Sequence, residues 1–385
     1  MHDFTFASVP DTRVGAGSAA ELGVIARKLR IKHALIVTDT GILGLGLLDK
    51  TLSGLSAQGV EVTIFSDVVA DPPEHVVLGA LEIAKHASCD GIIGFGGGSS
   101  LDVAKLLAVL MVGKQTLSEI YGVDQIDGSR LPLIQVPTTA GTGSEATMVS
   151  IITTGETTKA GVVSRLLLAD CIILDAQLTL GLPAHVTAAT GIDAMVHAIE
   201  AYTSVRLKNP LSDMLAIQAL HLLSRNIHIA VTRGEDLNAR QAMLIGAMLA
   251  GQAFANAPVA AVHALAYPLG GNYHLPHGLT NSLVLPHVLR FNAPAAEELY
   301  QQLLPYIMPS YNAQNAVADA SEILAVHFLD LAAQLSLPTT LEELGVQRDD
   351  LPRLAQEAML QQRLLVNNPR DVTFEDALKI YELAF

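Results

Sequence analysis

The chain has 385 residues, of which half are hydrophobic and 16% are charged. This composition is sufficient for a large buried core spread over two domains, and it argues against extended disorder. Asp and Glu outnumber Lys and Arg by 38 to 23, which gives a formal net charge of −15. That balance argues against a nucleic acid partner, because phosphate backbones are bound by clusters of Lys and Arg.

Export and membrane signals are not recognisable in the sequence. The amino terminus lacks a basic segment followed by an apolar one, and no apolar run reaches the ~18–20 residues that a membrane helix needs. We therefore expect a cytoplasmic protein without membrane association. Cys89 and Cys171 lie in apolar surroundings and do not form a CxxC pair, so both are predicted to be small core residues.

The first half of the chain alternates β-rich runs with helical stretches. Strands are predicted at residues 33–39, 60–65, 90–95, 131–137 and 169–175. Helices are predicted between them; one begins after Pro72 and Pro73, and another begins at a cluster of glycines. Strands that alternate with helices pair in parallel through right-handed crossovers. We therefore expect an open, mostly parallel α/β sheet that helices cover on both faces.

Helical periodicity dominates the second half of the chain. The sequence thus predicts an α/β domain at residues 1–180 and an all-helical domain at residues 181–385. Residues 242–289 contain no Asp, Glu, Lys or Arg, yet they contain four histidines. Because helices without charges are buried helices, this segment is a candidate location for a metal centre.

A glycine-rich motif and an aspartate indicate a nucleotide site. The motif GFGGGSSLDVAK at residues 94–105 places three consecutive glycines between a strand and a helix, where backbone N–H groups can approach a diphosphate. The motif is not the GxGxxG fingerprint of a standard Rossmann fold, and a tight strand-to-helix turn is the alternative interpretation. Asp39 ends the first clear strand, where a carboxylate binds a ribose 2′-hydroxyl and repels a 2′-phosphate, which favours NAD over NADP. Capping of the next helix explains Asp39 equally well.

A second loop, PTTAGTGSEAT at residues 137–147, follows another strand. Its side chains are small and offer hydroxyl hydrogen-bond donors, so the loop could line one side of a bound nucleotide. An ordinary Ser/Thr-rich loop has the same composition. The donors are Thr138, Thr139, Thr142 and Ser144. Lys159 can reach a ribose or a phosphate, although a lone lysine is more often solvated. Asp102, within the glycine motif, is a further candidate for a cofactor contact.

Four residues of the helical half form a candidate metal site. Asp193 and His197 stand at positions i and i+4 of a predicted helix, so their side chains share one face. His263 and His277 follow further along the chain. Taken alone, Asp193 and His197 fit a hydrogen-bonded pair on a helix surface, and each histidine fits a satisfied core residue. Together, three imidazoles and one carboxylate in a charge-poor region favour Fe(II) or Zn(II) over Mg(II) or Ca(II).

These motifs resemble those of the iron-containing (group III) alcohol dehydrogenases along essentially the whole chain. The matching stretches are GGGSSLDVAK, PTTAGTGSE, LPAHVTAATGIDAMVHAIEAY, VHALAYPLGG, LPHGLTNSLVLPHVLRFN and NNPR. The resemblance implies an amino-terminal α/β nucleotide-binding domain, a carboxy-terminal all-helical domain and a metal in the cleft between them. It also implies homo-oligomers, often dimers.

The resemblance assigns roles to individual residues. It implies that the metal ligands are Asp193, His197, His263 and His277. It implies cofactor contacts from Asp39, Gly97, Gly98, Ser99, Thr138, Thr139, Lys159 and Leu178.

Two positions depart from the family pattern. Asp71 stands in a place where members often have the Asn of an Asn-Pro-Thr sequence, so a cofactor contact does not carry over to it. Tyr267 stands where many members have a second histidine, four residues after the third ligand. The candidates for the proton relay are therefore Tyr267, one helical turn after His263, and His274. Tyr267 can equally be a wall of the substrate pocket.

The sequence thus predicts a metal-dependent, NAD-linked alcohol dehydrogenase or aldehyde reductase that transfers hydride between a small or medium alcohol and nicotinamide. Fe(II) is the expected ion, and Zn(II) fits the same ligands. The lack of basic residues near the histidines favours neutral aliphatic substrates over acids.

Three alternatives are compatible with parts of the sequence. A hydroxyacid–oxoacid transhydrogenase-like enzyme with tightly bound NAD is the nearest one, because the Tyr-Pro sequence also occurs there. A lyase resembling dehydroquinate synthase is less favoured. Such an enzyme needs Lys or Arg to bind a phosphorylated substrate, and residues 242–289 contain neither. A protein that binds NAD or metal without catalysis is disfavoured by the intact set of four ligands.

Overall fold

The structure, a computed structural model, describes residues 3–155, 158–311 and 319–385. Its internal contacts divide the chain into two compact units. One unit comprises residues 7–181, and the other comprises the segment that ends at Phe6 together with residues 182–385. Residues 3–6 thus pack with the carboxy-terminal unit, which the sequence pattern does not indicate.

The first unit is built on a six-stranded parallel sheet with the strand order β1-β9-β6-β4-β2-β3. The strands are β1 (Thr12–Val14), β2 (His33–Val37), β3 (Glu61–Phe65), β4 (Gly91–Gly96), β6 (Leu133–Pro137) and β9 (Cys171–Leu174). Every residue of β4 and β6 is buried, as parallel strands with two covered faces require. The predicted open parallel sheet is confirmed.

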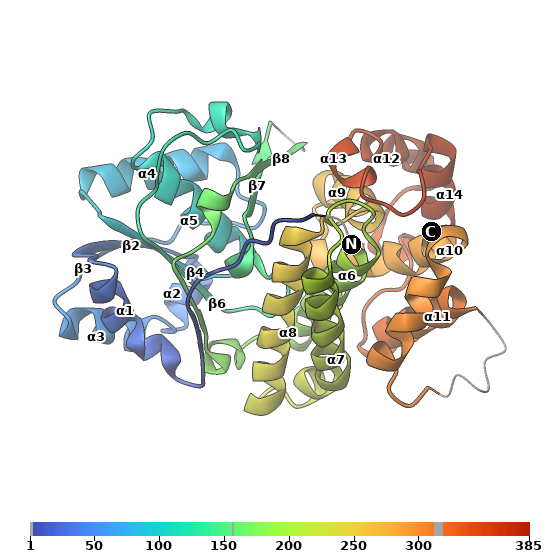
Figure 1. The fold of residues 1–385 in the computed structure, drawn as a ribbon, viewed down its shortest axis with the longest axis horizontal. Coiled ribbons are helices and arrows are strands. Elements are labelled where there is room, and N and C mark those ends of the chain that lie inside the picture. Colours follow the sequence, from blue (N-terminus) through green and yellow to red (C-terminus); the bar gives the residue numbers. More distant parts are fainter. Residues whose placement is uncertain (1–2, 156–157, 312–318) are drawn as a thin grey trace. The chain divides into compact units, whose positions relative to one another are not determined.

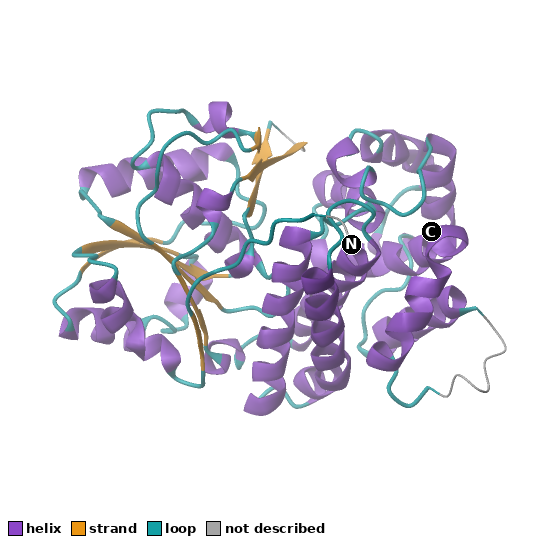
Figure 2. Ribbon diagram, in the orientation of Figure 1, coloured by secondary structure: helices purple, strands orange, loops and turns teal. Residues whose placement is uncertain are grey.

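Helices cover both faces of this sheet (Figures 1 and 2). On one side lie α1 (Leu22–Lys28) and α3 (Asp49–Ala57), and on the other lie α4 (Glu74–His86) and α5 (Gly98–Leu110). The short helix α2 (Thr40–Gly44) follows β2. Short 3-10 helices are η1 (Ser18–Glu21), η2 (Leu117–Ile120), η3 (Ser144–Ala146), η4 (Arg165–Leu167) and η5 (Ala176–Thr179). The apolar side chains of α1 and α3 pack against those of the strands and form one continuous core.

A second, three-stranded sheet in the same unit was missed by the sequence-based prediction. In it, β7 (Val149–Thr154) pairs antiparallel with β8 (Thr158–Val163), and β5 (Gly122–Val123) pairs in parallel with β8. Hydroxyl side chains and a glycine interrupt the apolar residues of β7 and β8, and most of these residues are only partly buried. The hydrophobic signal is therefore much weaker than that of the buried parallel strands.

The second unit is helical, and no strand occurs in its described residues 3–6, 182–311 and 319–385 (Figure 2). Its α-helices are α6 (Ala184–Thr203), α7 (Pro210–Thr232), α8 (Leu237–Asn256), α9 (Ala261–Tyr273), α10 (His277–Ile307), α11 (Ala320–Gln334), α12 (Leu351–Ala358), α13 (Gln362–Leu365) and α14 (Phe374–Ala384). Two 3-10 helices, η7 (Glu342–Leu344) and η8 (Arg348–Asp350), precede α12. The predicted all-helical organisation is confirmed.

The start of α7 shows how local sequence sets a helix boundary. The Asn209 side chain accepts hydrogen bonds from the backbone N–H groups of Leu211 and Ser212, and Pro210 occupies the first helical position. Such a cap supplies acceptors for the N–H groups of the first turn, which have no partner within the helix.

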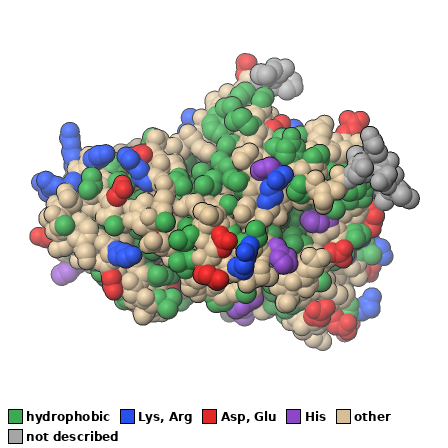
Figure 3. Space-filling model, turned by 90° about the horizontal axis from the view of Figure 1, so that it is seen from below, with side chains coloured by type: hydrophobic (Ala, Val, Ile, Leu, Met, Phe, Trp, Pro, Cys, Tyr) green, Lys and Arg blue, Asp and Glu red, His purple; other side chains and the backbone are tan. Residues whose placement is uncertain are grey.

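Both cysteines are buried and free, as predicted for core residues. No single helix among the described residues is long and apolar enough to cross a membrane; α8 and α9 meet that test only as a pair, which is bent by 108°. Acidic and basic side chains are scattered among uncharged ones over the face shown in Figure 3.

Candidate metal centre and cofactor loops

Four side chains from three helices of the helical unit converge on one point. Asp193 and His197 lie one turn apart on α6, His263 lies in the first turn of α9, and His277 begins α10. One potential ligand atom from each lies within 4.8 Å of the others. Oδ1 of Asp193 is 4.0 Å from Nε2 of His197 and 3.9 Å from Nε2 of His277. No second group of three such residues is placed in this way within the described part of the chain.

The cluster is mostly buried and carries a negative charge. Asp193, His197 and His263 are buried, whereas the side chain of His277 is 37% exposed. Burial raises the pKa of Asp193, but the three histidines and an amide hydrogen bond oppose this effect, so the pKa lies below its ordinary value. Asp193 is therefore a carboxylate at neutral pH, which is the form that binds a cation. Three imidazoles and one carboxylate fit a borderline divalent ion.

Ring stacking restrains two of the histidines. The His197 ring stacks on Phe254 of α8 at a centroid distance of 4.6 Å and on His263 at 4.7 Å. The ring of His277 is tilted against that of His263 at 5.3 Å. These contacts hold the imidazoles in position before any ion is bound.

Glu200 is hydrogen-bonded to one of the four candidate ligands, His263. The sequence pattern did not lead us to predict this contact. Its Oε2 lies 2.6 Å from Nδ1 of His263, and its Oε1 accepts a hydrogen bond from Val262 N at 2.7 Å. Because a carboxylate only accepts, Nδ1 of His263 carries the proton and Nε2 is left for a metal. A signal for Glu200 was present, since residues 193, 197 and 200 share one helical face by their i, i+4, i+7 spacing.

Asn281 also belongs to the cluster and was missed. It lies one turn after His277 on α10, and its Nδ2 donates to Oδ1 of Asp193 at 2.6 Å. The same atom lies 3.2 Å from Nε2 of His263 and 3.2 Å from Nε2 of His277. The amide therefore orients the carboxylate and contacts two of the imidazoles.

Gly278 permits the close approach of α10 to α6. A Cβ atom at this position would lie 2.5 Å from the carbonyl oxygen of Ala189 and 3.2 Å from Cβ of Asp193. Any side chain would therefore move the start of α10, and with it His277, away from α6.

The two candidates for proton transfer lie in different environments. The Tyr267 ring is 5.8 Å from the ring of His277, so this tyrosine is next to the cluster. His274 is exposed and ends α9 with a φ of 54°. Both relay roles stay predictions.

In the α/β unit, three loops lie together at the carboxyl edge of the sheet. Strand β4 is paired with β2 on one side and with β6 on the other, all in parallel. Asp39 therefore follows β2 beside the glycine turn that follows β4, and Thr138 follows β6 on the other side of that turn. The Thr138 N–H donates to the Gly96 carbonyl at 2.9 Å. Ligands of open α/β sheets bind at such an edge.

The glycine turn leaves the start of α5 open to an anion. Gly97 is the N-cap, it is extended, and no side chain caps the helix. A Cβ at Gly98 would lie 2.8 Å from Cγ2 of Thr142, and one at Gly97 would lie 3.7 Å from Cγ2 of Thr139. The absence of side chains thus lets the 137–147 loop pack directly on the turn. Ser99 lies in the first turn of α5.

The other candidate cofactor contacts have defined positions. Oδ1 of Asp39 caps α2 through Ile42 N at 2.9 Å, so the helix-capping interpretation is correct whether or not the residue also binds a ribose.

Lys159 of β8 pairs with Asp71, with 2.5 Å between Nζ and Oδ1. Leu178 is 8% exposed and belongs to the apolar core. Both carboxylate oxygens of Asp102 accept hydrogen bonds within the protein. Cofactor contacts from these residues stay predictions.

Family models match both units. Residues 10–176 match the model of iron-containing alcohol dehydrogenase, and residues 187–385 match the carboxy-terminal model of the Fe-containing alcohol dehydrogenase family. The chain is 40% identical over 379 residues to Long-chain-alcohol dehydrogenase 1 of Geobacillus thermodenitrificans (strain NG80-2), with coverage of 98% of this chain and 95% of that protein.

Solved structures agree with these matches. The crystal structure of a 1,3-propanediol oxidoreductase has a TM-score of 0.95 and 35% identity, and all of both chains is covered. The structure of sulfoacetaldehyde reductase from Bifidobacterium kashiwanohense in complex with NAD+ has a TM-score of 0.89 and 28% identity, with coverage of 100% of this chain and 99% of that one. Because the two family models and a full-length relative agree, this chain belongs to the iron-containing alcohol dehydrogenase family.

Proposed function

We propose that this chain is an NAD-dependent alcohol dehydrogenase or aldehyde reductase that uses Fe(II) and acts on small or medium alcohols. The observation that carries the proposal is the convergence of Asp193, His197, His263 and His277 within 4.8 Å. When bound there, a divalent ion supplies Lewis-acid polarisation of a carbonyl or alcohol group. Zn(II) fits the same donors, so the choice of Fe(II) rests on the family.

The residues around the ion hold its ligands in place. Glu200 fixes the tautomer of His263, and Asn281 orients the carboxylate of Asp193. Alcohol oxidation releases a proton, and Tyr267 is one proposed relay, since its ring lies 5.8 Å from that of His277. His274 is the second candidate.

NAD is the proposed hydride carrier, and a structurally similar protein was crystallised in complex with NAD+. The uncapped start of α5 and the packed 137–147 loop suit its diphosphate. Asp39 disfavours a 2′-phosphate and thus NADP. The proposed contacts are Asp39, Gly97, Gly98, Ser99, Thr138, Thr139, Lys159 and Leu178.

The substrate class follows from charge. The similar proteins are named for a long-chain alcohol, for 1,3-propanediol and for sulfoacetaldehyde, so family membership alone does not select a substrate. Residues 242–289, which include two of the ligands, carry no charged side chain other than histidine. A neutral aliphatic alcohol or aldehyde therefore fits better than an acid.

The proposed assembly is a homodimer, as the resemblance implies, and the proposed compartment is the cytoplasm. Molar mass from light scattering at several protein concentrations measures the oligomeric state directly. A mass of one chain at every concentration would contradict the dimer.

The first test measures NADH formation by protein reconstituted anaerobically with Fe(II), using a panel of primary alcohols, diols and hydroxy acids. We expect turnover with free NAD in the wild type and a loss of at least about 1,000-fold in Asp193→Ala, because a metal ligand is removed. Asp371→Ala, which changes an exposed aspartate of the same unit, is the matched control and should retain activity.

One outcome would exclude the dehydrogenase, and a second would identify a transhydrogenase in its place. If the protein holds Fe(II) and NAD but oxidises no alcohol with free NAD, the dehydrogenase is excluded. If reduction of a keto acid then restores oxidation of a hydroxy acid, the enzyme is a transhydrogenase that recycles bound NAD.

A further inference from the structure

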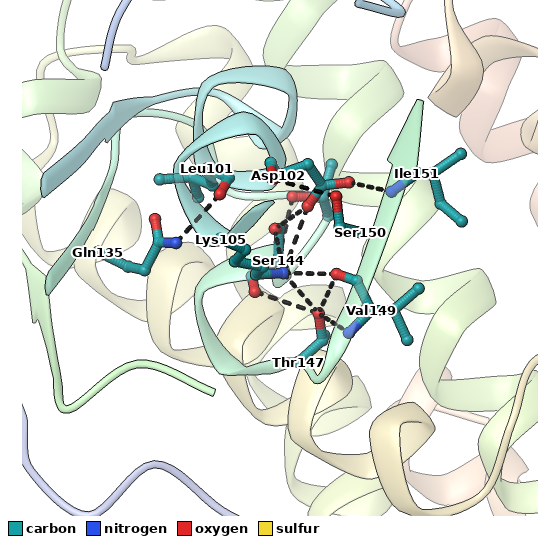
Figure 4. Close-up of polar contacts among 10 residues, drawn as sticks. Leu101, Asp102, Lys105, Gln135, Ser144, Thr147, Val149, Ser150 and Ile151 are labelled. Carbon is teal, nitrogen blue, oxygen red and sulfur yellow. Dashed lines mark hydrogen bonds and ion pairs between the residues drawn. The ribbon is translucent and has the colours of Figure 1, made fainter. Parts of the chain in front are cut away.

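A completely buried lysine lies in the helix that follows the glycine turn. Lys105 is on α5 and its side chain has no exposed surface. It therefore cannot contact a ligand, and any influence on binding must pass through its neighbours. Figure 4 shows these neighbours, which come from α5, from η3 and β7, and from the short link between the last two.

The Lys105 ammonium group joins α5 to the segment after β6. Its Nζ donates to Ser144 Oγ at 2.7 Å, to Thr147 Oγ1 at 2.9 Å and to the Val149 carbonyl at 2.7 Å. It also lies 3.3 Å from Oδ1 of Asp102, one turn earlier on the same helix. The three N–H donors are thus all used, and the charge has a counterion.

Asp102 makes matching contacts from the other side. Its Oδ1 accepts a hydrogen bond from Ser144 Oγ at 2.5 Å, and its Oδ2 accepts one from Ile151 N at 2.8 Å. Its backbone carbonyl accepts from Ser150 Oγ at 3.0 Å. The carboxylate is therefore engaged within the protein, in contacts that join α5 to η3 and β7.

An ion pair with a fully buried lysine is a costly way to stabilise a fold. Burial lowers the pKa of Lys105, and Asp102 only partly offsets this effect. Apolar residues of similar volume often replace buried ion pairs without loss of stability. A network in which every donor is satisfied instead specifies one arrangement of the groups that it joins.

The arrangement that this network specifies is that of the two loops assigned to the cofactor. Ser144 lies in the same 137–147 loop as Thr138, Thr139 and Thr142, and Thr142 packs against Gly98 at the start of α5. A shift of Ser144 would therefore change the surface on which a diphosphate would rest.

We propose that Lys105 and Asp102 form a positioning clamp, which fixes the 137–147 loop against the first turn of α5 in the conformation that binds the diphosphate of the cofactor. Asp102 then acts through the loop instead of by direct contact with NAD. This inference rests on the proposed function, in which the two loops hold NAD.

The test measures the dissociation constants of NADH, by its own fluorescence, and of ADP-ribose, by competition. Lys105→Met keeps the length of the side chain and removes its donors. We expect both dissociation constants to rise about 10- to 100-fold, since misplaced binding groups have effects of that size. The Fe(II) affinity should stay within about twofold, because the four candidate metal ligands belong to the helical unit. Lys114→Met, which changes an exposed lysine after the same helix, is the matched control.

Variants of the partners separate positioning from direct contact. If the clamp acts as a unit, Asp102→Asn should weaken NADH binding about as much as Lys105→Met, and the double variant should be no worse than either. Additive effects would instead show that Asp102 contacts the cofactor independently, and would overturn the clamp.

Milder variants keep the test decisive if Lys105→Met does not fold. Ser144→Ala and Thr147→Val each remove one acceptor of the ammonium group, and each should raise the NADH dissociation constant severalfold. A lower melting temperature with an unchanged dissociation constant in folded variants would show a purely structural role and overturn the proposal. If the wild type itself binds no NADH, that result contradicts the proposed function, and the clamp proposal, which rests on it, is excluded as well.

Discussion

At the residue scale, the metal cluster depends on side chains that are not ligands themselves. Glu200 is 4% exposed, and its two oxygens bind His263 Nδ1 and Val262 N. A buried carboxylate is stable only when it is hydrogen-bonded in this way. The same contact leaves the unprotonated Nε2 of His263 as the ring atom that can bind a metal.

We expect Glu200→Gln to weaken Fe(II) or Zn(II) binding about 10- to 100-fold, the usual effect of removing a hydrogen-bond partner of a ligand. A glutamine amide can donate to Nδ1, which would move the ring proton to Nε2 and block the metal. Competition with a chromophoric chelator measures the affinity without any assay of activity. Glu298→Gln, at an exposed position of α10, should have no effect. Equal affinities in wild type and Glu200→Gln would refute this role.

At the scale of elements, the cluster depends on how closely α10 approaches α6. His277 and Asn281 are on α10, whereas Asp193 and His197 are on α6. Only a glycine at position 278 fits against the Ala189 carbonyl, which a Cβ would approach to 2.5 Å. The packing of α10 on α6 and the position of the candidate ligand His277 are thus set by the same contact.

We expect Gly278→Ala to lower the free energy of unfolding by about 1–3 kcal/mol, as overpacking usually does, and also to weaken metal binding. Urea unfolding and a metal titration measure the two effects. Gly270→Ala is the matched control, because a Cβ there meets only the Leu275 carbonyl at 3.6 Å, an ordinary contact. That variant should be neutral or slightly stabilised, because alanine favours the helix. If Gly278→Ala bound metal as tightly as Gly270→Ala, the close approach would not matter for the site.

At the scale of the whole molecule, the two proposed ligands belong to different units. The four metal-binding side chains lie within residues 182–385, and the loops assigned to NAD lie within residues 7–181. A ligand stabilises the folded state of the unit that binds it by about 2.7 kcal/mol when its concentration is a hundred times its dissociation constant. The two ligands should therefore stabilise different parts of the chain.

We expect chelation of the metal to reduce amide hydrogen-exchange protection mainly in peptides from residues 182–385. Addition of NAD should increase protection mainly in peptides from residues 7–181. Exchange measured by mass spectrometry resolves the two sets of peptides. Equal changes in both units for either ligand would contradict this prediction and show that the chain opens as one cooperative body.

Much of this organisation could be predicted from the sequence, because strong local patterns encode it. The buried runs of β2, β4 and β6 produced continuous apolar segments, and the i, i+4 spacing placed Asp193 and His197 on one helical face. Strands β7 and β8 were missed, because partly buried strands with hydroxyl groups carry a weak hydrophobic signal.

The two kinds of unit, the glycine turn, the family and the residue types of the metal cluster could all be read from local patterns in the chain. The tertiary structure decided which distant residues meet: Glu200 with His263, Asn281 with Asp193, and Lys105 with Ser144. The physical reason is that periodicity and motif spacing report the contacts of a residue with its chain neighbours. Hydrogen bonds between separate helices depend on the packing of whole elements, which no local pattern of residues specifies.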